Sequence, residues 1–527
     1  MESTSLHIVD YLIIFTSLAV SVGVGVWFSK AQSTTSKYFS AGGNVPSWAI
    51  GMSIFATLIS SITFLAYPGD GFGGNWVRLV QGLMVPLVLF AGIGFVVPLY
   101  REVIGLSAYE YFEKRFGYLA RVYSSLAFVL AHFSKMGSVF FLLALAVASM
   151  TAIDTYTVIL VLGVAIILLT LLGGIEAVIW LDVIQGFLLI FGGLITLVII
   201  LGHIDGGLGT VLSTAMAADK MSLGSLEWDF VNLTFWVMAI NGIFYTIQKY
   251  GTDQTIVQRY LTARSDRDAI KASILGVMLV VPVWALSMFI GTALWVFYQG
   301  GDALPPDTRA DAVFPLFIMS ELPIGVVGLI ISALMAAAIS SLDSDLNCLA
   351  AVGVDDYYKR LRPDSTDAQR VRVGKAIVVA SGLGAMIVAS IYVSAGDAGV
   401  LGTVFALYAI FSGGIAGLFL LGIFVPRANK QGLYVGIGAC VVFTAGALLT
   451  STPIALGGEP RILLDLGPLN YTHHNYMLGV YSHIVLFVTA WGASYFFPEP
   501  EVAENLTYAG WRKRKRAAAA DAVAVGR

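Results

Sequence analysis

The residues best suited to chemistry lie between positions 336 and 345, inside a segment apolar enough to cross a bilayer. Four small residues there are spaced i, i+3, i+4 and i+7 and share one helix face: Ala337, Ser340, Ser341 and Ser344. Aspartates stand at 343 and 345. Lone serines in membrane helices usually bond their own backbone, but clustered ionisable groups at this depth indicate an ion or substrate site. Small oxygen ligands beside carboxylates suit a hard cation such as sodium rather than a transition metal.

The composition of the chain is that of a membrane protein. Of its 527 residues, 57% are hydrophobic and 12% are charged, and a soluble domain carries about twice that share of charge. Apolar runs of about 20 residues predict thirteen spans, near 8–28, 46–66, 78–100, 123–150, 154–173, 178–202, 230–250, 271–298, 319–349, 374–394, 399–424, 431–450 and 476–497. We therefore expect an all-α integral membrane protein.

Lysine and arginine residues are concentrated in alternate loops. The basic segments, which hold 25 of the 30 such residues, are the loops near 29–45, 101–122, 249–272, 353–375 and 425–431 and the tail after 497. The positive-inside rule makes these segments cytoplasmic, with the N-terminus outside and the C-terminus inside. We expect the protein to lie in the cell's inner (plasma) membrane.

Two of the expected spans are interrupted at corresponding positions. The second is rich in serine and threonine and ends in Tyr67-Pro68-Gly69-Asp70-Gly71, and the seventh carries Asn241, Gly242, Thr246 and Gln248. Because they lie five spans apart, the second set of five helices runs opposite to the first. Such pairs indicate an inverted-repeat transporter, whose broken helices expose carbonyls and helix ends to a cation or anion. The alternative is that these polar residues only join helices.

Three segments carry a resemblance to a known family. They are Gly173-Gly174-Ile175-Glu176-Ala177-Val178-Ile179-Trp180-Leu181-Asp182-Val183-Ile184-Gln185-Gly186, Gly251-Thr252-Asp253-Gln254-Thr255-Ile256-Val257-Gln258-Arg259-Tyr260-Leu261, and residues 336–344. On these the chain resembles the sodium/solute symporters over roughly residues 8–497. The resemblance implies the leucine-transporter fold, a five-plus-five inverted repeat with about thirteen helices. The expected parts are a first helix and loop (1–45), two repeats (46–202 and 203–424), and two further helices with a basic tail (425–527).

The resemblance also implies where one or two sodium ions bind. The family's common site corresponds to the carbonyls of Ala56, Ile59 and Ala337 and the hydroxyls of Ser340 and Ser341. Similarity to bacterial sialic-acid transporters implies a second cation site of Asp182, Ser340, Asp343 and Ser344. Because Asp343 stands where those transporters have serine, the two carboxylates either strengthen cation binding or share a proton. The alternative for Asp182 is pairing with a neighbouring basic residue.

A substrate site beside the interrupted second helix follows from the same resemblance. Its expected residues are Thr57, Ser60, Ser61, Thr63, Gln81, Lys135 and Gln248, with Tyr67 and Phe72 as an outer gate. Lys135 stands where the sialic-acid transporters have an arginine, and it is the only lysine or arginine well inside an expected span. We expect it to contact a substrate carboxylate, directly or through water, because an unpaired buried ammonium is costly. The alternative is a permanent partner, such as Asp70.

The expected activity is sodium-coupled import of a sugar or sugar acid, with a monocarboxylate or similar organic anion as the alternative. The residues matching the galactose transporters' polar contacts depart from that pattern: Thr246, Lys249, Met278 and Phe405. A neutral hexose is therefore disfavoured. A channel or a transporter-derived sensor is less favoured, and we expect no enzyme, since no nucleophile–base–orienter set is apparent. The expected partners are the solute, sodium ions and the lipid bilayer, without nucleic acid or an obligate protein partner.

Overall fold

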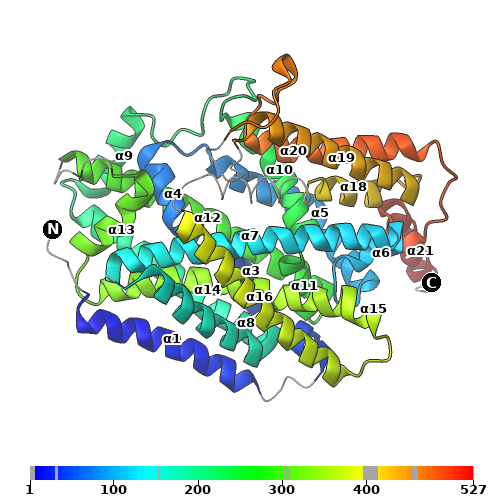
Figure 1. Cartoon of the computed structure of the whole chain (residues 1–527), viewed down its shortest axis with the longest axis horizontal. Coiled ribbons are helices and arrows are strands. Elements are labelled where there is room, and N and C mark those ends of the chain that lie inside the picture. Colours follow the sequence, from blue (N-terminus) through cyan, green and yellow to red (C-terminus); the bar gives the residue numbers. More distant parts are fainter. Residues whose placement is uncertain are drawn as a thin grey trace.

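The computed structural model describes residues 6–29, 34–151, 153–300, 304–305, 308–395, 413–453 and 461–525. Regular structure in these ranges is helical, apart from one isolated bridge between Val45 and Ala263. The expected all-α class is therefore confirmed. Figure 1 shows the N-terminus near one end of the long axis of the molecule and the C-terminus near the other.

Long helices make up the body of the protein. They are α1 (Ile8–Ser29), α5 (Leu79–Val103), α7 (Tyr118–Thr151), α8 (Thr155–Gly202), α12 (Asp266–Gly300), α14 (Val326–Val352), α16 (Asp367–Ala395), α19 (Lys430–Ser451) and α20 (Asn475–Ser494).

Shorter helices connect or interrupt the long ones. They are α2 (Thr35–Ser40), α3 (Ser47–Leu58), α4 (Ser61–Gly73), α6 (Glu110–Phe116), α9 (Gly207–Ala217), α10 (Phe235–Gly251), α11 (Gln254–Thr262), α13 (Ala310–Glu321), α15 (Lys359–Leu361), α18 (Ile415–Phe424) and α21 (Tyr508–Val525). Single turns occur at η1 (Ala41–Gly43), η2 (Gly353–Tyr358), η3 (Gly467–Leu469) and η4 (Glu504–Leu506).

Nine helices in the described ranges are long and apolar enough to cross a membrane, or ten if the bent pair α3–α4 is one span. The expected number of thirteen is not confirmed. The span expected at 399–424 falls partly on residues 399–412, which lie outside the described residues.

The spans expected at 154–173 and 178–202 lie together in α8, which has 48 residues. A helix of about 72 Å exceeds two bilayer cores, and a break at Gly174 (φ +57°) divides it.

The interruption expected in the second span is the break between α3 and α4. α3 ends at Leu58, and the extended dihedral angles of Ile59 and Ser60 separate it from α4. Ser60 then begins α4 through a capping box with Thr63, which satisfies backbone amides that a helix start leaves unpaired. The axes of the two helices differ by 57°. The break therefore lies inside the protein with its backbone polar groups exposed to neighbouring side chains.

α14 occupies the centre of the helix bundle. Nearly all of its residues are buried, and it packs against α8, α3, α7 and α16. Small residues allow the close approach to α8: a Cβ atom added at Gly192 would lie 3.1 Å from the Cβ atom of Ala333. This kind of contact is typical of helices packed in membranes. It brings the serines and aspartates of α14 against the α3–α4 break.

Candidate functional site

The five residues expected to form a sodium site come together where α14 passes the α3–α4 break: Ala56, Ile59, Ala337, Ser340 and Ser341. The Ser340 hydroxyl lies 3.0 Å from the Ala56 carbonyl oxygen and 3.2 Å from that of Ala337. The Ser341 hydroxyl lies 3.4 Å from the Ile59 carbonyl oxygen and 3.3 Å from that of Thr57. All of these residues are buried, so the oxygen cluster is shielded from bulk solvent.

The balance of donors and acceptors in this oxygen cluster favours a cation. Two hydroxyl groups face four carbonyl oxygens, and each hydroxyl has only one hydrogen to donate. A small hard cation contacts several such oxygens at once, because each hydroxyl can turn its hydrogen away. The Thr57 and Ile59 carbonyls are available because Ile59 (φ −95°, ψ 115°) ends α3 and no helical amides follow them, whereas the Ala56 carbonyl also accepts a hydrogen bond from the Ile59 amide at 3.2 Å.

Arg259 of α11 is the principal partner of Asp182. Its Nη2 atom lies 3.0 Å from Asp182 Oδ2, 2.7 Å from Ser344 Oγ and 2.6 Å from Thr57 Oγ1. Its Nε atom donates to Ser53 Oγ at 2.7 Å, and that hydroxyl donates to Asp182 Oδ2 at 2.5 Å. Arg259 and Asp182 are both fully buried. The guanidinium therefore supplies the positive charge that a buried carboxylate needs.

The four residues of the expected second cation site are arranged around this guanidinium and not around one common point. Asp182 and Ser344 both contact Arg259, while the Ser340 hydroxyl faces the carbonyl cluster. Both carboxyl oxygens of Asp343 are buried and have no hydrogen-bond partner among the described residues. Asp182 pairs with the basic residue Arg259 in this conformation, which is the alternative expected for it from the sequence.

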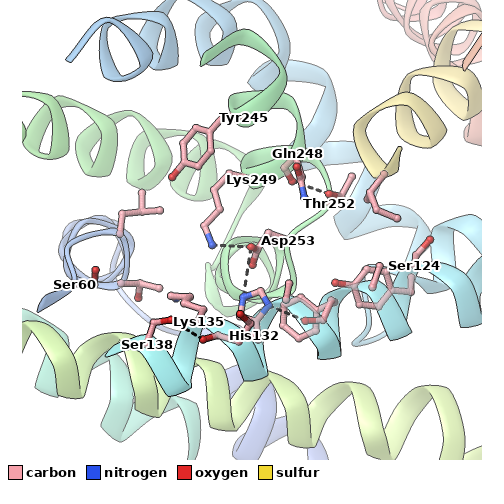
Figure 2. A pocket seen from close by; sticks show the side chains of 18 residues that line it. Ser60, Ser124, His132, Lys135, Ser138, Tyr245, Gln248, Lys249, Thr252 and Asp253 are labelled. Atoms are coloured by element: carbon pink, nitrogen blue, oxygen red, sulfur yellow. Dashed lines mark hydrogen bonds and ion pairs between the residues drawn. The ribbon is translucent and has the colours of Figure 1, made fainter. Parts of the chain in front are cut away.

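A cavity of about 430 Å³ lies beside the break, between α3, α7 and α10 (Figure 2). Four of the seven expected substrate residues line it: Thr57, Ser60, Lys135 and Gln248. Tyr245 and Lys249 line it from α10, and His132 lines it from α7. The cavity therefore combines hydroxyl, amide and ammonium groups.

The other three expected substrate residues lie outside the lining of this cavity. The Ser61 hydroxyl donates to the Val139 carbonyl oxygen at 3.3 Å. Thr63 takes part in the cap of α4. Gln81 lies on α5 where that helix meets α10: a Cβ atom at Gly242 would come within 2.8 Å of the Gln81 carbonyl oxygen.

The two expected gate residues pack against α12. The ring of Tyr67 stacks on Trp284 with centroids 5.8 Å apart, and Phe72 meets Tyr298 edge-on at 6.4 Å. Neither belongs to the lining of the cavity. In this conformation both aromatic residues of α4 are held by a neighbouring helix.

Lys135 has a partner that was not among the expected ones. Its Nζ atom lies 3.0 Å from Asp345 Oδ2 and 3.1 Å from Asp345 Oδ1. Lys135 therefore has a permanent charged partner in this conformation, but that partner is Asp345 and not Asp70, which pairs with Arg78 at 3.4 Å. Asp345 reaches Lys135 because successive side chains of α14 point in different directions around the helix axis. At about 100° per residue, Asp345 points away from Ser344 and toward α7.

Two functional candidates, Arg259 and Asp253, have no assigned role in the sequence-based expectation. On the sequence alone, Arg259 counts only among the charges of the basic loop at 249–272, although it lies in the segment 251–261 that resembles the symporter family. A signal was available, because Asp182 inside an apolar span needs a counter-charge. Asp253 accepts a hydrogen bond from Lys249 at 2.6 Å and lies within the cavity lining. Its pairing with Lys249 follows the i, i+4 spacing.

Sequence comparison places the chain among membrane transporters. The sequence model of the Sodium:solute symporter family matches residues 38–438. The chain is 34% identical over 443 residues to the sodium/sialic acid symporter NanT of Aliivibrio fischeri, covering 84% of this chain and 88% of NanT. It is 35% identical over 450 residues to the sodium/sialic acid symporter SiaT of Proteus mirabilis, covering 85% of this chain and 91% of SiaT.

Structural comparison agrees with the sequence comparison. A solved structure of a Na+-coupled sialic acid symporter, substrate-bound and outward-open, superposes with a TM-score of 0.85 and 31% sequence identity. The match covers 94% of this chain and 100% of that chain. The shared arrangement is the leucine-transporter fold. With its broken α3–α4 helix and its cluster of sodium-compatible oxygens, the chain belongs to the sodium:solute symporter family and is a sodium-coupled, multi-pass membrane symporter, not an enzyme.

Proposed function

We propose that this symporter imports a sugar acid, with sialic acids as the first candidates. The observation that carries the proposal is the position of Lys135, which lines the 430 Å³ cavity and whose ammonium contacts Asp345 on α14, the helix that also carries Ser340 and Ser341. An ammonium forms a charge-assisted hydrogen bond with a carboxylate. The names of the two similar bacterial symporters, both sodium/sialic acid symporters, support the same substrate class.

The remaining lining of the cavity suits a polyhydroxylated solute. Ser60 of the break, Ser138 of α7, and Tyr245 and Gln248 of α10 offer hydroxyl and amide groups, and Figure 2 shows them around one space. A volume of about 430 Å³ lies within the usual range for small-molecule sites. A monocarboxylate is the second candidate, because it would use the same ammonium but few of these other groups.

Sodium binding at the carbonyl cluster would be coupled to substrate through the α3–α4 break. The proposed sodium ligands are Ala56, Ile59, Ala337, Ser340 and Ser341. Residues of the break serve both sites: Ala56 and Ile59 face the oxygens of α14, and Thr57 and Ser60 line the cavity. An ion that fixes the break therefore also fixes substrate groups. Such coupling is reciprocal, and substrate strengthens sodium binding to the same extent.

A second cation site at Asp182, Ser340, Asp343 and Ser344 is part of the proposal under one condition. Arg259 contacts Asp182 and Ser344 in this conformation, so its guanidinium would have to move for a cation to bind them. The unpartnered oxygens of Asp343 support a role in binding a cation or a proton.

We also propose Ser61, Thr63 and Gln81 as substrate residues, with Tyr67 and Phe72 as the gate, in a conformation in which α4 and α5 face the solute.

The proposed orientation places the basic end of the molecule in the cytoplasm. Figure 1 shows α6, α15 and α21 at the end that carries the C-terminus, opposite α9 and α13. These three helices hold or adjoin three of the basic segments. Under the positive-inside rule the N-terminus is then outside, and the protein lies in the plasma membrane. The inverted repeats are proposed at residues 46–202 and 203–424.

A thermal-stability screen of the purified protein tests the substrate class. The ligands are N-acetylneuraminate, glucuronate, galactose and lactate, each measured in sodium and in potassium chloride. We expect sugar acids to raise the melting temperature in sodium only, because ligands that bind the folded state stabilise it by mass action. Stabilisation by lactate alone would favour the monocarboxylate class. Stabilisation by galactose to the same degree as by the acids would contradict a role for the ammonium in selecting the substrate.

A further inference from the structure

Five side chains beside the cavity form a continuous series in which a histidine lies between two lysine–aspartate pairs. Lys249 Nζ lies 2.6 Å from Asp253 Oδ2, and Lys135 Nζ lies 3.1 Å from Asp345 Oδ1. His132 stands between the two pairs: its Nε2 atom is 3.6 Å from Asp253 Oδ2 and 3.6 Å from Asp345 Oδ1. Figure 2 shows the imidazole of His132 beneath Asp253, with Lys249 reaching the same carboxylate from above. The histidine therefore bridges two lysine–aspartate pairs from different helices.

The hydrogen bond made by the other ring nitrogen fixes the tautomer of His132. Its Nδ1 atom lies 2.9 Å from the Phe128 carbonyl oxygen. A carbonyl oxygen only accepts, so Nδ1 carries a hydrogen. In the neutral imidazole Nε2 is then an acceptor, and it faces two carboxylates. Nε2 is buried and has no hydrogen-bond partner among the described residues. A proton on Nε2 would make this nitrogen a hydrogen-bond donor directed at both carboxylates, and would remove the repulsion between its lone pair and their oxygens.

The charges around His132 balance only while the substrate is absent. The groups facing the ring are Lys135 on the same helix, Asp345 on α14, Lys249 on α10, and Asp253 between α10 and α11. The two ammonium groups and two carboxylates sum to zero with a neutral imidazole. A bound substrate carboxylate would attract the Lys135 ammonium and so reduce the positive charge beside Asp345. It would also add one negative charge to a largely buried space. Uncompensated charge in such a space is costly.

We propose that His132 is a proton-binding site that is filled when an anionic substrate binds. One proton passes from the water of the cavity to Nε2 and is held between Asp345 and Asp253. The substrate carboxylate and the imidazolium then cancel, so the pocket returns to zero net charge. His132 itself lines the cavity, which gives the proton an aqueous route. Binding of a sugar acid is thereby linked to uptake of up to one proton, in addition to sodium.

Calorimetry in buffers of different ionisation enthalpy measures this proton directly. The proposal rests on the proposed function in taking N-acetylneuraminate as the anionic ligand. At pH 7 in sodium, we expect the binding enthalpy of the wild type to vary linearly with buffer ionisation enthalpy, with a slope that reports net proton uptake. In His132→Gln the slope should fall to near zero. A slope unchanged by this substitution would overturn the proposal.

A matched control is available on α8. His203 also places Nδ1 against the carbonyl oxygen four residues earlier, at 2.8 Å, but it is exposed and its ring meets Phe297 and Phe317. His203→Gln should therefore keep the wild-type slope. Loss of the slope in this variant as well would assign the proton uptake to a general change in the protein and contradict the role of His132.

A second measurement needs no substrate and so separates the two proposals. Lys135→Gln removes the ammonium from Asp345 in the same way that a substrate would, so His132 should hold a proton in this variant. Its melting temperature in sodium should then fall as the pH is raised through the pKa of this imidazole, because stabilisation by a protonated histidine is lost as the proton leaves. Lys135→Gln/His132→Gln should show no such fall.

Should N-acetylneuraminate fail to bind, the proposed substrate is wrong, while the comparison of the single and double variants still decides the proton site. Identical pH profiles for the single and double variants would rule the site out. If Lys135→Gln does not fold, Lys249→Gln, with and without His132→Gln, removes the ammonium from Asp253 and makes the same comparison.

Discussion

At the scale of single residues, the hydroxyls of Ser340 and Ser341 join α14 to the break between α3 and α4. Removing both leaves the break carbonyls without these two oxygen neighbours. We expect Ser340→Ala/Ser341→Ala to weaken sodium binding by at least about tenfold, which corresponds to about 1.4 kcal/mol. The sodium concentration that gives half-maximal thermal stabilisation measures this change.

Ser332 on the same helix provides the control for that substitution. Its hydroxyl donates to the Gly328 carbonyl oxygen of its own helix at 2.8 Å and it is buried. Ser332→Ala should leave the sodium dependence as in the wild type. A double variant that retains wild-type sodium affinity would remove Ser340 and Ser341 from the site.

Arg259 should contribute strongly to stability, because it pairs with a carboxylate in a fully buried position. Arg259→Gln would leave the buried Asp182 carboxyl group without its partner, a change that costs about 3–5 kcal/mol for a buried pair. We therefore predict a clear fall in melting temperature. Arg259→Gln/Asp182→Asn should recover part of that loss, because neither charge is then stranded. A double variant no more stable than the single one would mean that the other contacts of Arg259 dominate.

The shared face of the three α14 residues was predictable at this scale, and the ion pairs between distant segments were not. Spacing along one helix is a property of sequence, so the common face of Ala337, Ser340 and Ser341 follows from it. Arg259 and Asp182 are 77 positions apart and meet only because α11 folds back toward α8. Asp345 was visible in the sequence, but which neighbour it faces depends on how α14 is rotated against α7.

At the scale of elements, α4 is held against α12 by two glycines in reciprocal contact. A Cβ atom at Gly71 would lie 2.1 Å from the Met288 carbonyl oxygen, and one at Gly291 would lie 1.9 Å from the Pro68 carbonyl oxygen. Backbone approaches this close require glycine on each side. The second half of the broken helix is therefore fixed to α12 through main-chain contacts, which positions the start of α4 at the site.

Gly291→Ala tests this crossing. The added methyl group would force α12 away from Pro68, and overpacking of this kind costs about 1–3 kcal/mol. We expect a lower melting temperature and weaker sodium binding together, because displacement of α4 also displaces the break. Gly94→Ala is the control: it lies on α5 with no atom within 4 Å of the added Cβ. Equal effects of the two substitutions would show that the crossing has no special role.

Element boundaries illustrate a second limit of sequence. The apolar runs at 154–173 and 178–202 are correctly located, yet they form one helical stretch whose direction changes at Gly174. Hydropathy detects that a segment is apolar but not whether its neighbour continues the same helix. The break between α3 and α4 was easier to predict, since serine and threonine residues interrupt the apolar run around it; Pro68 and the glycines that follow it lie inside α4 and do not mark the break.

At the scale of the whole molecule, the sodium and substrate sites share one structural element, the α3–α4 break. Adjacent positions of this break face the two sites, so each ligand can bias the same conformation. A coupling of about 1–3 kcal/mol would be ordinary for two such sites. Sodium should accordingly lower the dissociation constant of N-acetylneuraminate by about 5- to 150-fold, and the substrate should lower that of sodium by the same factor.

The most direct test of sodium-coupled sugar-acid import is accumulation of radiolabelled N-acetylneuraminate in proteoliposomes. An inward sodium gradient should drive the internal concentration above the external one, and a sodium ionophore should abolish this excess. Potassium in place of sodium, or Ser340→Ala/Ser341→Ala in place of the wild type, should give no accumulation above equilibrium. Accumulation that persists in potassium, or that survives the double substitution, would contradict sodium coupling through this site.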